Sequence, residues 1–547
     1  MNNTQIIKRL DHLTAERKTL DATWETLEEF VVPYRGQFFR NQTSEHEQDW
    51  RQRQIFDSTA VNACQTLSAS IHGSITSPAY RWFDLQFRVD ALNQTQEAKE
   101  WLDDTADRIY NALQESNFNL EISECYTDLV SYGTSVVLEE FTGDELTGED
   151  IDLVFSAVPI KEAYFEEDHK GGIATFYRRL MWTPSQIISK FGEDGVPEKV
   201  NAMEAAGKTD RMEVVYCIWK RKDIDEKSIE GIVAPEKRPY AFRYLLKEGG
   251  ETLGEEGGYY EMPAYAPRWR KTSESKWGNS PAMNALSDVL TLNQLVELIL
   301  RSAEKVIDPA WATTMNNLLS DFDQRPAGLN ILRDPSKLLP LNSQARFDVS
   351  QLAKQDLISS IQQAFYMDQL QLKDSPAMTA TETMARMELM QRTLGPTLGR
   401  LQSDLLDPLI SRTLNILFRS GQLKEVPDSL KEQGGDIDVA YVGSMSRSQK
   451  MDTVANVERY LGLLGGIAQF KPEVLDLFNQ DKAARDLGVD LNIPAAYLNS
   501  DEDVQALRQQ RAQQQQAQFE AENMKAGGEA MQAVGKGQKE LEGDPNA

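Results

Sequence analysis

The chain has 547 residues, of which 40% are hydrophobic and 26% are charged, so it is long enough for several domains with a large core. Its formal charge of −27 at pH 7 argues against a protein that grips nucleic acid, because affinity for phosphate comes mainly from Lys and Arg. No run approaches the ~20 consecutive apolar residues of a membrane-spanning helix, and the first residues lack the pattern of a signal peptide. We therefore expect a protein that stays in the compartment where it is made.

The N-terminal part of the chain is predicted to be helical. Apolar residues near 3.6-residue spacing indicate four helices, over residues 4–31, 57–76, 96–115 and 120–131. Asp57 is the expected N-cap of the second helix, and Gly133 follows the last one.

Residues 135–270 are predicted to form an antiparallel α+β region that packs against these helices. Short runs rich in β-branched and aromatic residues, separated by Gly, Asp and Pro, indicate strands over residues 136–138, 151–158, 173–182, 212–220 and 240–246. A short helix over residues 184–191 interrupts them.

A stalk is predicted next. Ser280 is an expected N-cap, and the helix after it has an apolar face that includes Val289, Val296 and Val306. A second helix is expected over residues 350–372. The segment between the two helices contains several prolines, which predicts a small separate module on the end of a helical pair.

A third long helix is predicted to begin at Thr379, which forms a capping box with Glu382. Because Pro396 and Pro408 lie inside it, we expect this helix to be bent. A helical bundle over residues 446–487 and a Gln-rich helix follow, and the Gln-rich helix gives way to a Gly, Lys and Glu tail.

Several patterns resemble chemical sites without completing them. Residues 202–209 match the second half of a phosphate-binding loop, but Ala202 replaces the first glycine and no strand is predicted before it, so we expect a surface loop. The run Glu166-Glu167-Asp168-His169 places acids on alternating faces of a strand, which favours a solvated hairpin turn over a metal site. The cysteines are far apart and never in a CxxC pair, which predicts buried free thiols at Cys64, Cys125 and Cys217.

Six short stretches, taken in order, carry a resemblance to a known family. They are Asp-Ser-Thr-Ala at 57–60, Thr-Ser-Pro at 76–78, Arg-Trp-Phe at 81–83, the junction at 129–134, Gly-Asn-Ser-Pro at 278–281 and Thr-Ala-Thr-Glu at 379–382. Their order and spacing over nearly the whole chain resemble the head-to-tail connecting (portal) proteins of short-tailed, T7-like bacteriophages.

The resemblance implies a multidomain α+β portal fold that is mainly helical. Its parts would be, in chain order, a wing with antiparallel strands (1–280), a first stem helix (281–306), a small clip (307–349), a second stem helix (350–372), a tunnel loop (373–378), a kinked tunnel-side helix with a return to the wing (379–445), a helical crown (446–499), and a Gln-rich helix that can join a barrel, with its tail (500–547).

The resemblance also implies a non-enzymatic function. About twelve copies would form a ring at one capsid vertex of the virion, assembled in the host cytoplasm, through which a terminase drives DNA and from which the tail is later hung. The implied partners are the major capsid protein, a scaffolding protein, the terminase large subunit, tail adaptor and nozzle proteins, and the double-stranded DNA that passes through. No cofactor, metal or membrane is implied.

Two groups of residues are candidates for these contacts. The first is the tunnel loop, in which Lys373 would make transient phosphate contacts beside Asp374, Ser375, Pro376, Ala377 and Met378. The second is a set of clip residues for docking terminase and adaptor, namely Trp311, Met315, Arg325 and Arg333, although Trp311 could instead pack inside the clip.

Two other classes of protein remain as alternatives. A scaffolding or internal virion protein would be mostly helical and would leave the strand region unexplained. A packaging ATPase or nuclease would need a complete phosphate loop or converging acids.

Overall fold

The structure is a computed structural model. It describes residues 1–35, 54–89, 93, 95–143, 152–169, 171–224, 231–272, 274–319, 322–323, 330–341, 347–367, 394–424, 426–427, 437–441, 444–468, 478, 482–484, 487–488, 504–516 and 518. The chain forms two compact units. The first comprises Met1–Asp84, Thr105–Lys424 and Val439–Met445, and the second comprises Leu85–Asp104, Glu425–Asp438 and Ser446–Ala547.

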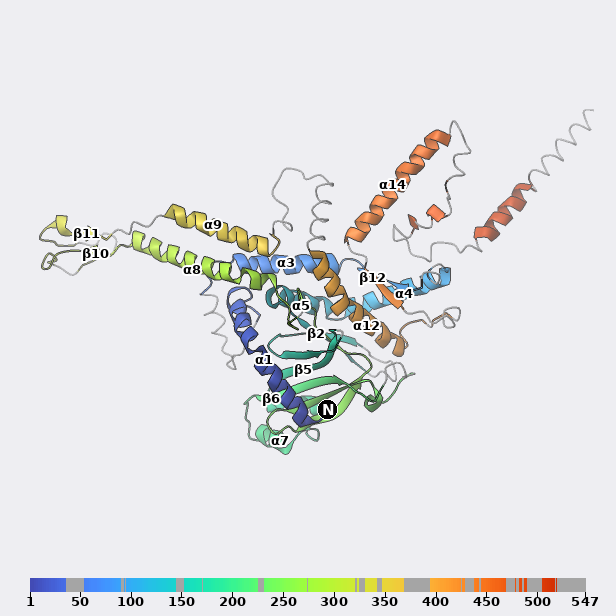
Figure 1. Cartoon of the computed structure of the whole chain (residues 1–547), viewed down its shortest axis with the longest axis horizontal. Coiled ribbons are helices and arrows are strands. Elements are labelled where there is room, and N and C mark those ends of the chain that lie inside the picture. The colour runs from blue at the N-terminus through green and yellow to red at the C-terminus, as the bar shows by residue number, and fades with distance from the viewer. Residues whose placement is uncertain are drawn as a thin grey trace, which may run out of the picture. The chain divides into compact units, whose positions relative to one another are not determined.

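Helices and strands alternate in blocks along the chain (Figure 1). The helices are α1 (Asn3–Phe30), α3 (Thr59–Ile75), α4 (Gln96–Glu115), α5 (Phe118–Tyr132), α6 (Pro184–Phe191), α7 (Glu198–Ala205), α8 (Pro281–Ile307), α9 (Phe347–Ala364), α12 (Asp407–Arg419) and α14 (Ser444–Ala468). The strands are β1 (Phe83–Phe87), β2 (Val136–Thr142), β3 (Asp152–Val158), β4 (Ala163–Glu167), β5 (Ile173–Trp182), β6 (Met212–Lys220), β7 (Tyr240–Leu246), β8 (Thr252–Tyr259), β9 (Ala264–Tyr265), β10 (Trp311–Ala312), β11 (Leu339–Pro340) and β12 (Ile437–Tyr441).

Two antiparallel sheets form the strand region of the first unit. One has five strands in the order β4-β5-β6-β7-β8, and the other has three in the order β3-β2-β9. Helix α1 covers one face of the five-stranded sheet (Figure 1). The core between them consists of apolar side chains of α1 and of the sheet, namely Ile6, Leu10, Leu13, Tyr164, Tyr177, Val215, Cys217, Trp219, Ala241 and Leu245.

A buried arginine fixes α1 to the start of this sheet. The Arg17 guanidinium donates to the carbonyl oxygens of Ile160 at 2.8 Å and Ala163 at 2.6 Å, and it stacks 3.8 Å from the Tyr164 ring centroid. Asp21, one turn further along α1, lies 2.7 Å from the Arg17 Nε. These partners compensate the desolvation of a charge that is only 1% exposed.

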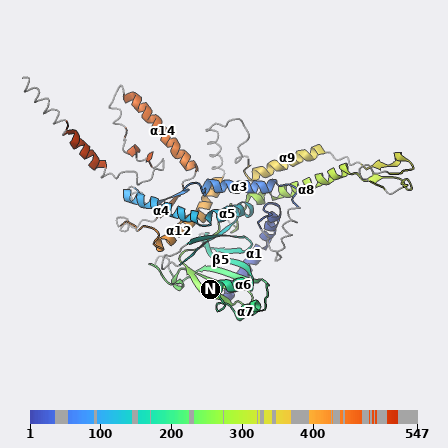
Figure 2. The same ribbon diagram turned by 180° about the vertical axis from the view of Figure 1, so that it is seen from behind.

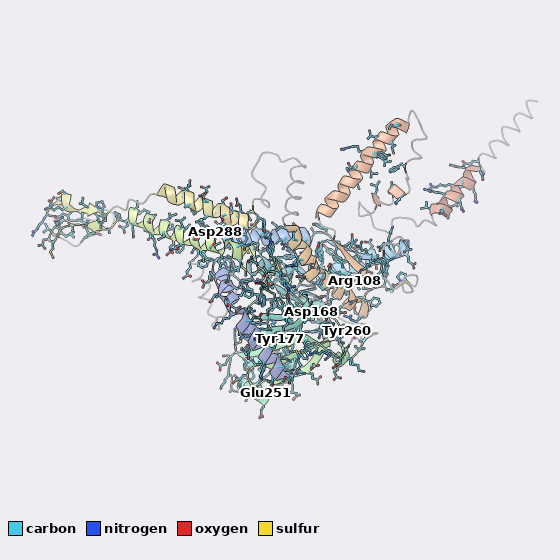
Figure 3. The ribbon with its side chains drawn as sticks, in the orientation of Figure 1. Arg108, Asp168, Tyr177, Glu251, Tyr260 and Asp288 are labelled. Atoms are coloured by element: carbon cyan, nitrogen blue, oxygen red, sulfur yellow. The ribbon has the colours of Figure 1, made fainter. Side chains whose placement is uncertain are left out.

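Helices α8 and α9 run side by side and form the stalk, as both views show (Figures 1 and 2). The Ser360 hydroxyl of α9 donates to the Asp288 carboxylate of α8 at 2.6 Å (Figure 3). The strands β10 and β11 pair antiparallel at the far end of the stalk, within the segment 308–341 that we call the insert. The predicted helical pair with a small module on its end is therefore observed.

Four predicted elements have the bounds that the sequence indicated. They are the strands over residues 173–182, 212–220 and 240–246 and the helix over residues 184–191. Strands β4, β8 and β9 were not predicted, because β4 ends in two glutamates, β8 carries glutamates and glycines, and β9 has only two residues. Their pairing with neighbouring strands outweighs a weak local preference.

Other predictions need correction. The N-cap of α3 is Ser58 and not Asp57, although the Asp57 carboxylate accepts a hydrogen bond from the Thr59 N–H at 2.9 Å. The second stalk helix spans Phe347–Ala364 rather than residues 350–372. Within the run 202–209, the first residues belong to α7 rather than to a loop.

Where a bend was expected before residue 408, the structure has a π-helical turn. Residues 394–401 are helical, Gln402–Leu406 form the turn η5, and α12 begins at Asp407. Pro408 has no N–H to donate to the carbonyl of residue 404, and the Asp407 N–H bonds instead to the Gln402 carbonyl. The predicted capping box at Thr379 lies outside the described residues.

The second unit contains α14 and a helix over residues 504–516, within the segment predicted to be a Gln-rich helix. The Phe87 and Trp101 rings stack at 6.3 Å, and Tyr460 contacts Phe478 at 5.9 Å. Among the described residues, no helix has the length and apolarity needed to span a bilayer. All three cysteines are buried and free, as predicted.

Candidate functional site

The stalk begins where two distant parts of the sequence cross. Gly133, which ends α5 with a φ of 78°, lies against Gly278, and a Cβ atom on Gly278 would be 2.1 Å from the Gly133 carbonyl oxygen. The Ser280 hydroxyl caps α8 by accepting from the Met283 N–H at 2.9 Å, and it donates to the Ser131 carbonyl at 2.7 Å. We call Ser131, Gly133, Gly278 and Ser280 the stalk root.

Two of the stretches that carried the family resemblance meet at this root. The stretch 129–134 and the stretch 278–281 are separated by more than a hundred residues, yet the Gly278 N–H donates to the Thr134 hydroxyl at 2.8 Å. The Trp269 N–H donates to the Gly133 carbonyl at 2.9 Å. The root therefore fixes the start of α8 on the end of α5.

An ion network joins the root to the π-helical turn. Arg268, only 5% exposed, pairs with Glu167 at the end of β4 and with Asp404 of η5, whose carboxylate lies 3.2 Å from its guanidinium. Lys271 lies 2.6 Å from the other oxygen of Glu167. The run 166–169 was predicted to be a solvated hairpin turn. The β4–β5 hairpin is present, but Glu167 is paired instead of solvated.

Helix α12 is held by a second cluster, the α12 clamp, which comprises Glu139, Glu261, Tyr265, Arg412 and Thr413. Glu139 of β2 is fully buried and accepts hydrogen bonds from the Tyr265 hydroxyl and, at 2.8 Å, from the Thr413 hydroxyl. The Arg412 Nε lies 3.8 Å from Glu139, and its Nη1 donates to the Glu261 carbonyl at 2.9 Å. The clamp thus fixes α12 on the three-stranded sheet.

The pKa of Glu139 is raised to about 7, because burial disfavours its charged form more than Arg412 and the two hydroxyls favour it. A raised pKa in the folded state means that the folded protein binds this proton more tightly than the unfolded chain does. The stabilisation from that proton is complete below the unfolded pKa of about 4.5 and is lost as the pH rises through 7.

We therefore expect the free energy of unfolding of the wild type to fall by about 2 kcal/mol between pH 5 and pH 7, relative to that of Glu139→Gln. Urea unfolding of both proteins at several pH values measures this difference. The variant removes the titrating group, so the other ionisable groups cancel in the comparison. A difference that is constant from pH 5 to pH 8 would contradict the assignment.

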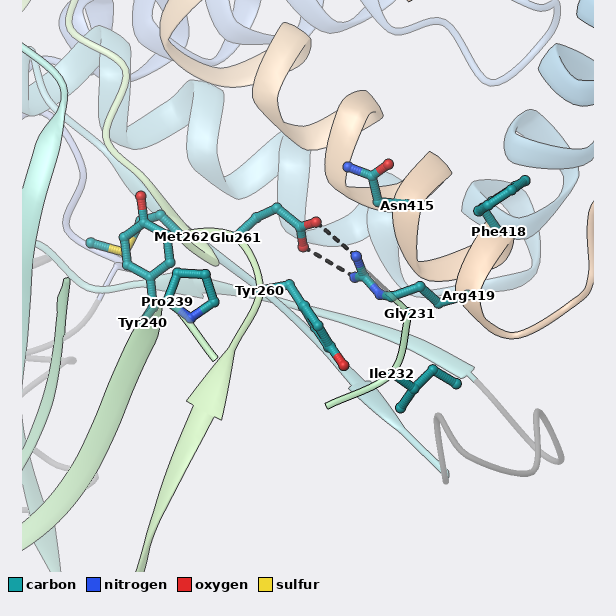
Figure 4. Close-up of a pocket in the computed structure, with 10 residues that line it drawn as sticks. All are labelled: Gly231, Ile232, Pro239, Tyr240, Tyr260, Glu261, Met262, Asn415, Phe418 and Arg419. Carbon is teal, nitrogen blue, oxygen red and sulfur yellow. Dashed lines mark hydrogen bonds and ion pairs between the residues drawn. The ribbon is translucent and has the colours of Figure 1, made fainter. Parts of the chain in front are cut away.

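A cavity of about 600 Å³ opens beside the clamp (Figure 4). The Arg419 guanidinium forms two hydrogen bonds with Glu261, at 2.8 and 3.1 Å, on its wall. Tyr260, Phe418 and Ile232 supply apolar surface around that pair. The cavity wall thus combines this ion pair with apolar side chains.

The insert places three of the predicted clip residues. Trp311 is 40% exposed and its ring contacts Phe322 edge-on at 6.0 Å, whereas Met315 is 96% exposed. Arg333 is exposed, and its N–H donates to the Asn317 carbonyl at 2.9 Å. Arg325 lies outside the described residues, and so do all six tunnel-loop residues from Lys373 to Met378.

Asn317 holds the two sides of the insert together and was not singled out from the sequence. It is 4% exposed, its amide nitrogen donates to the Asp334 carbonyl at 3.1 Å, and its amide oxygen accepts from the Asp334 N–H at 2.9 Å. A lone asparagine gives no sequence signal for this role. Glu139 does give one, because it directly follows the apolar run 136–138 of a predicted strand.

Among the residues that the structure describes, no group of three or more His, Cys, Asp or Glu side chains could hold a metal ion.

A family model for the bacteriophage head to tail connecting protein matches residues 3–498. The chain belongs to this family. The "Probable portal protein" of Bordetella phage BPP-1 is 28% identical to this connector over 97% of the chain and 95% of the relative. The "Portal protein" of Salmonella phage epsilon15 is 28% identical over 99% and 96%, and that of Enterobacteria phage T3 is 23% identical over 77% and 74%.

The predicted identity as a head-to-tail connecting (portal) protein is thus confirmed, and the relative from T3 agrees with the resemblance to T7-like phages. The family is structural rather than catalytic. The α+β class is confirmed by the helices and antiparallel sheets of this connector.

Proposed function

We propose that copies of this chain close into a ring of about twelve at one vertex of the phage capsid, and that the ring is the passage for DNA during packaging and ejection. The finer partners follow from this proposal: capsid and scaffolding proteins, the terminase large subunit, tail adaptor and nozzle proteins, and the double-stranded DNA in the channel. The observation that carries the proposal is the outer half of α8.

The two halves of α8 differ in burial. Its first half buries Ala285, Val289 and Leu292. In its second half, Leu298 is 53% exposed and Ile307 is 84% exposed, and Val306, which was predicted to lie on the apolar face, is 49% exposed. Within the described chain, the outer half of α8 therefore leaves large apolar side chains exposed.

The insert shows the same feature. Its exposed large apolar side chains, each 51% exposed or more, are Met315, Leu319, Ile331, Leu339 and Leu341. A module of this size with so much apolar surface and one buried asparagine needs a covering partner. Copies of the same chain, related by a rotation that closes, would supply that cover for both the stalk and the insert.

The domain layout proposed from the family fits this arrangement. Helices α8 and α9 would be the stem and the insert would be the clip, with Trp311, Met315, Arg325 and Arg333 available for terminase and tail adaptor. The loop from Lys373 to Met378 would face the DNA. The formal charge of −27 on each copy would keep the channel wall from binding phosphate tightly.

The ring is tested by placing a charge on the outer half of α8. We expect Leu298→Asp to prevent ring formation, because the ring would have to bury an unpaired carboxylate. Leu298→Met is the matched control, since it keeps an apolar side chain of similar volume, and it should form rings as the wild type does. Negative-stain images and light-scattering masses of the three proteins give the result.

Loss of the ring can be told apart from unfolding of the subunit, because Leu298 is already half exposed in the isolated chain. Leu298→Asp should therefore keep the circular dichroism spectrum of the folded subunit while losing the ring. Rings of normal mass from Leu298→Asp would refute the proposed interface.

A further inference from the structure

Helix α9 ends in an unusual backbone conformation. Tyr366 has a φ of 58°, and Asn316 is the only other described non-glycine residue with a positive φ. Asparagine enters this region readily, whereas a bulky aromatic residue there is an outlier. The neighbouring side chains keep Tyr366 in place, because Phe365 is fully buried and Met367 is 5% exposed.

Two residues hold the Tyr366 side chain. The Arg270 guanidinium donates to the Tyr366 hydroxyl at 3.2 Å, and the Trp269 ring lies 6.4 Å away at a tilt of 33°. A glycine would adopt this backbone conformation without strain but could make neither contact. The unfavourable backbone conformation of Tyr366 is thus accompanied by a ring contact and a hydroxyl contact, and glycine would lose both.

The partners of Tyr366 are bonded to the stalk root and to the residue between its members Gly278 and Ser280. The Trp269 N–H donates to Gly133, and the Arg270 carbonyl accepts from the Asn279 N–H at 2.7 Å. The root therefore fixes both the start of α8 and the end of α9. Tyr366 sets the direction in which the chain leaves the stalk, and it precedes the predicted tunnel loop, which begins at Lys373.

We propose that Tyr366 is a positioning residue, which fixes where the chain leaves the stalk and hence where the loop after it is presented to DNA. This inference rests on the proposed passage of DNA through a ring. Its structural part, a fixed exit from α9, can be tested without DNA.

The experiment compares assembled rings of the full-length wild type with Tyr366→Gly and Tyr366→Phe. The glycine relieves the strain and removes both contacts, and the phenylalanine keeps the ring contact and loses the hydroxyl. Lys373 is the first Lys or Arg after Tyr366, so trypsin cleavage after Lys373, followed by mass spectrometry, reports on restraint of this segment. Nuclease-protected DNA in a packaging reaction reports on function.

We expect Tyr366→Gly to form normal rings, to be cleaved after Lys373 severalfold faster, and to package severalfold less DNA, with Tyr366→Phe between the two. Cleavage and packaging equal to the wild type would overturn the inference, and so would faster cleavage with normal packaging. Failure of both variants to form rings would also overturn it, because Tyr366 would then serve the fold. If wild-type rings package no DNA, the proposed function fails, while the cleavage comparison still tests the exit from α9.

Discussion

Gly278→Ala is expected to destabilise the subunit by about 3 kcal/mol or more, with loss of most of the soluble folded protein. The added Cβ would lie 2.1 Å from the Gly133 carbonyl oxygen and 3.0 Å from its carbonyl carbon. Both are backbone atoms at the end of α5, so neither can move without disturbing the stalk root. The segment that leads into α8 would be forced away from the end of α5.

The matched control is Gly73→Ala. Gly73 lies inside α3, and a Cβ atom placed there meets nothing within 4 Å. Alanine at that position should be neutral or stabilise the helix by about 0.5 kcal/mol. Thermal unfolding of the two variants beside the wild type gives the comparison, and an equal melting temperature for Gly278→Ala and the wild type would show that the root can relax.

Arg412→Ala is expected to cost about 3–5 kcal/mol, because it removes one partner of a buried pair and leaves Glu139 without a nearby positive charge. Arg412 is 2% exposed and Glu139 is fully buried, so water cannot replace the lost interaction. The loss also frees Glu261 from one of its two arginines. We expect α12 to detach from the three-stranded sheet at lower denaturant concentration than the rest of the first unit unfolds.

A surface pair serves as the control for this prediction. Lys199 pairs with Glu248 at 2.8 Å, but the two side chains are 49% and 82% exposed. Lys199→Ala should change the free energy of unfolding by less than about 0.5 kcal/mol. Hydrogen exchange of the α12 amides, together with urea unfolding, tests both variants. Unchanged protection of α12 in Arg412→Ala would contradict the role assigned to the clamp.

The sequence predicted local elements well where one periodic pattern governed a whole segment. The strand at 212–220 is buried along nearly its whole length, and its β-branched and aromatic residues left no competing interpretation. The strand at 252–259 was missed, since its glutamates and glycines have low strand preference and its place depends on β7. Long-range pairing is not visible in a local pattern.

The candidate site was predictable only in part. Met315 was named as a clip residue from the family resemblance, and its side chain is 96% exposed. The α12 clamp was not predicted, because Glu139 and Arg412 are far apart in the chain and no local pattern shows that they meet. Tyr366 could not be found either, because a backbone angle leaves no trace in residue type.

By itself, the sequence determined the membership of the connector family, the order of the main helices and of five strands, and the helical pair with its small insert. These features depend on the spacing and type of residues along short stretches, and not on contacts between distant parts of the chain. Only the tertiary structure decided that Gly133 meets Gly278, that Glu139 is buried against Arg412, and that α9 ends on the root of α8. Those contacts join residues distant in sequence, and packing and desolvation of the whole first unit select them.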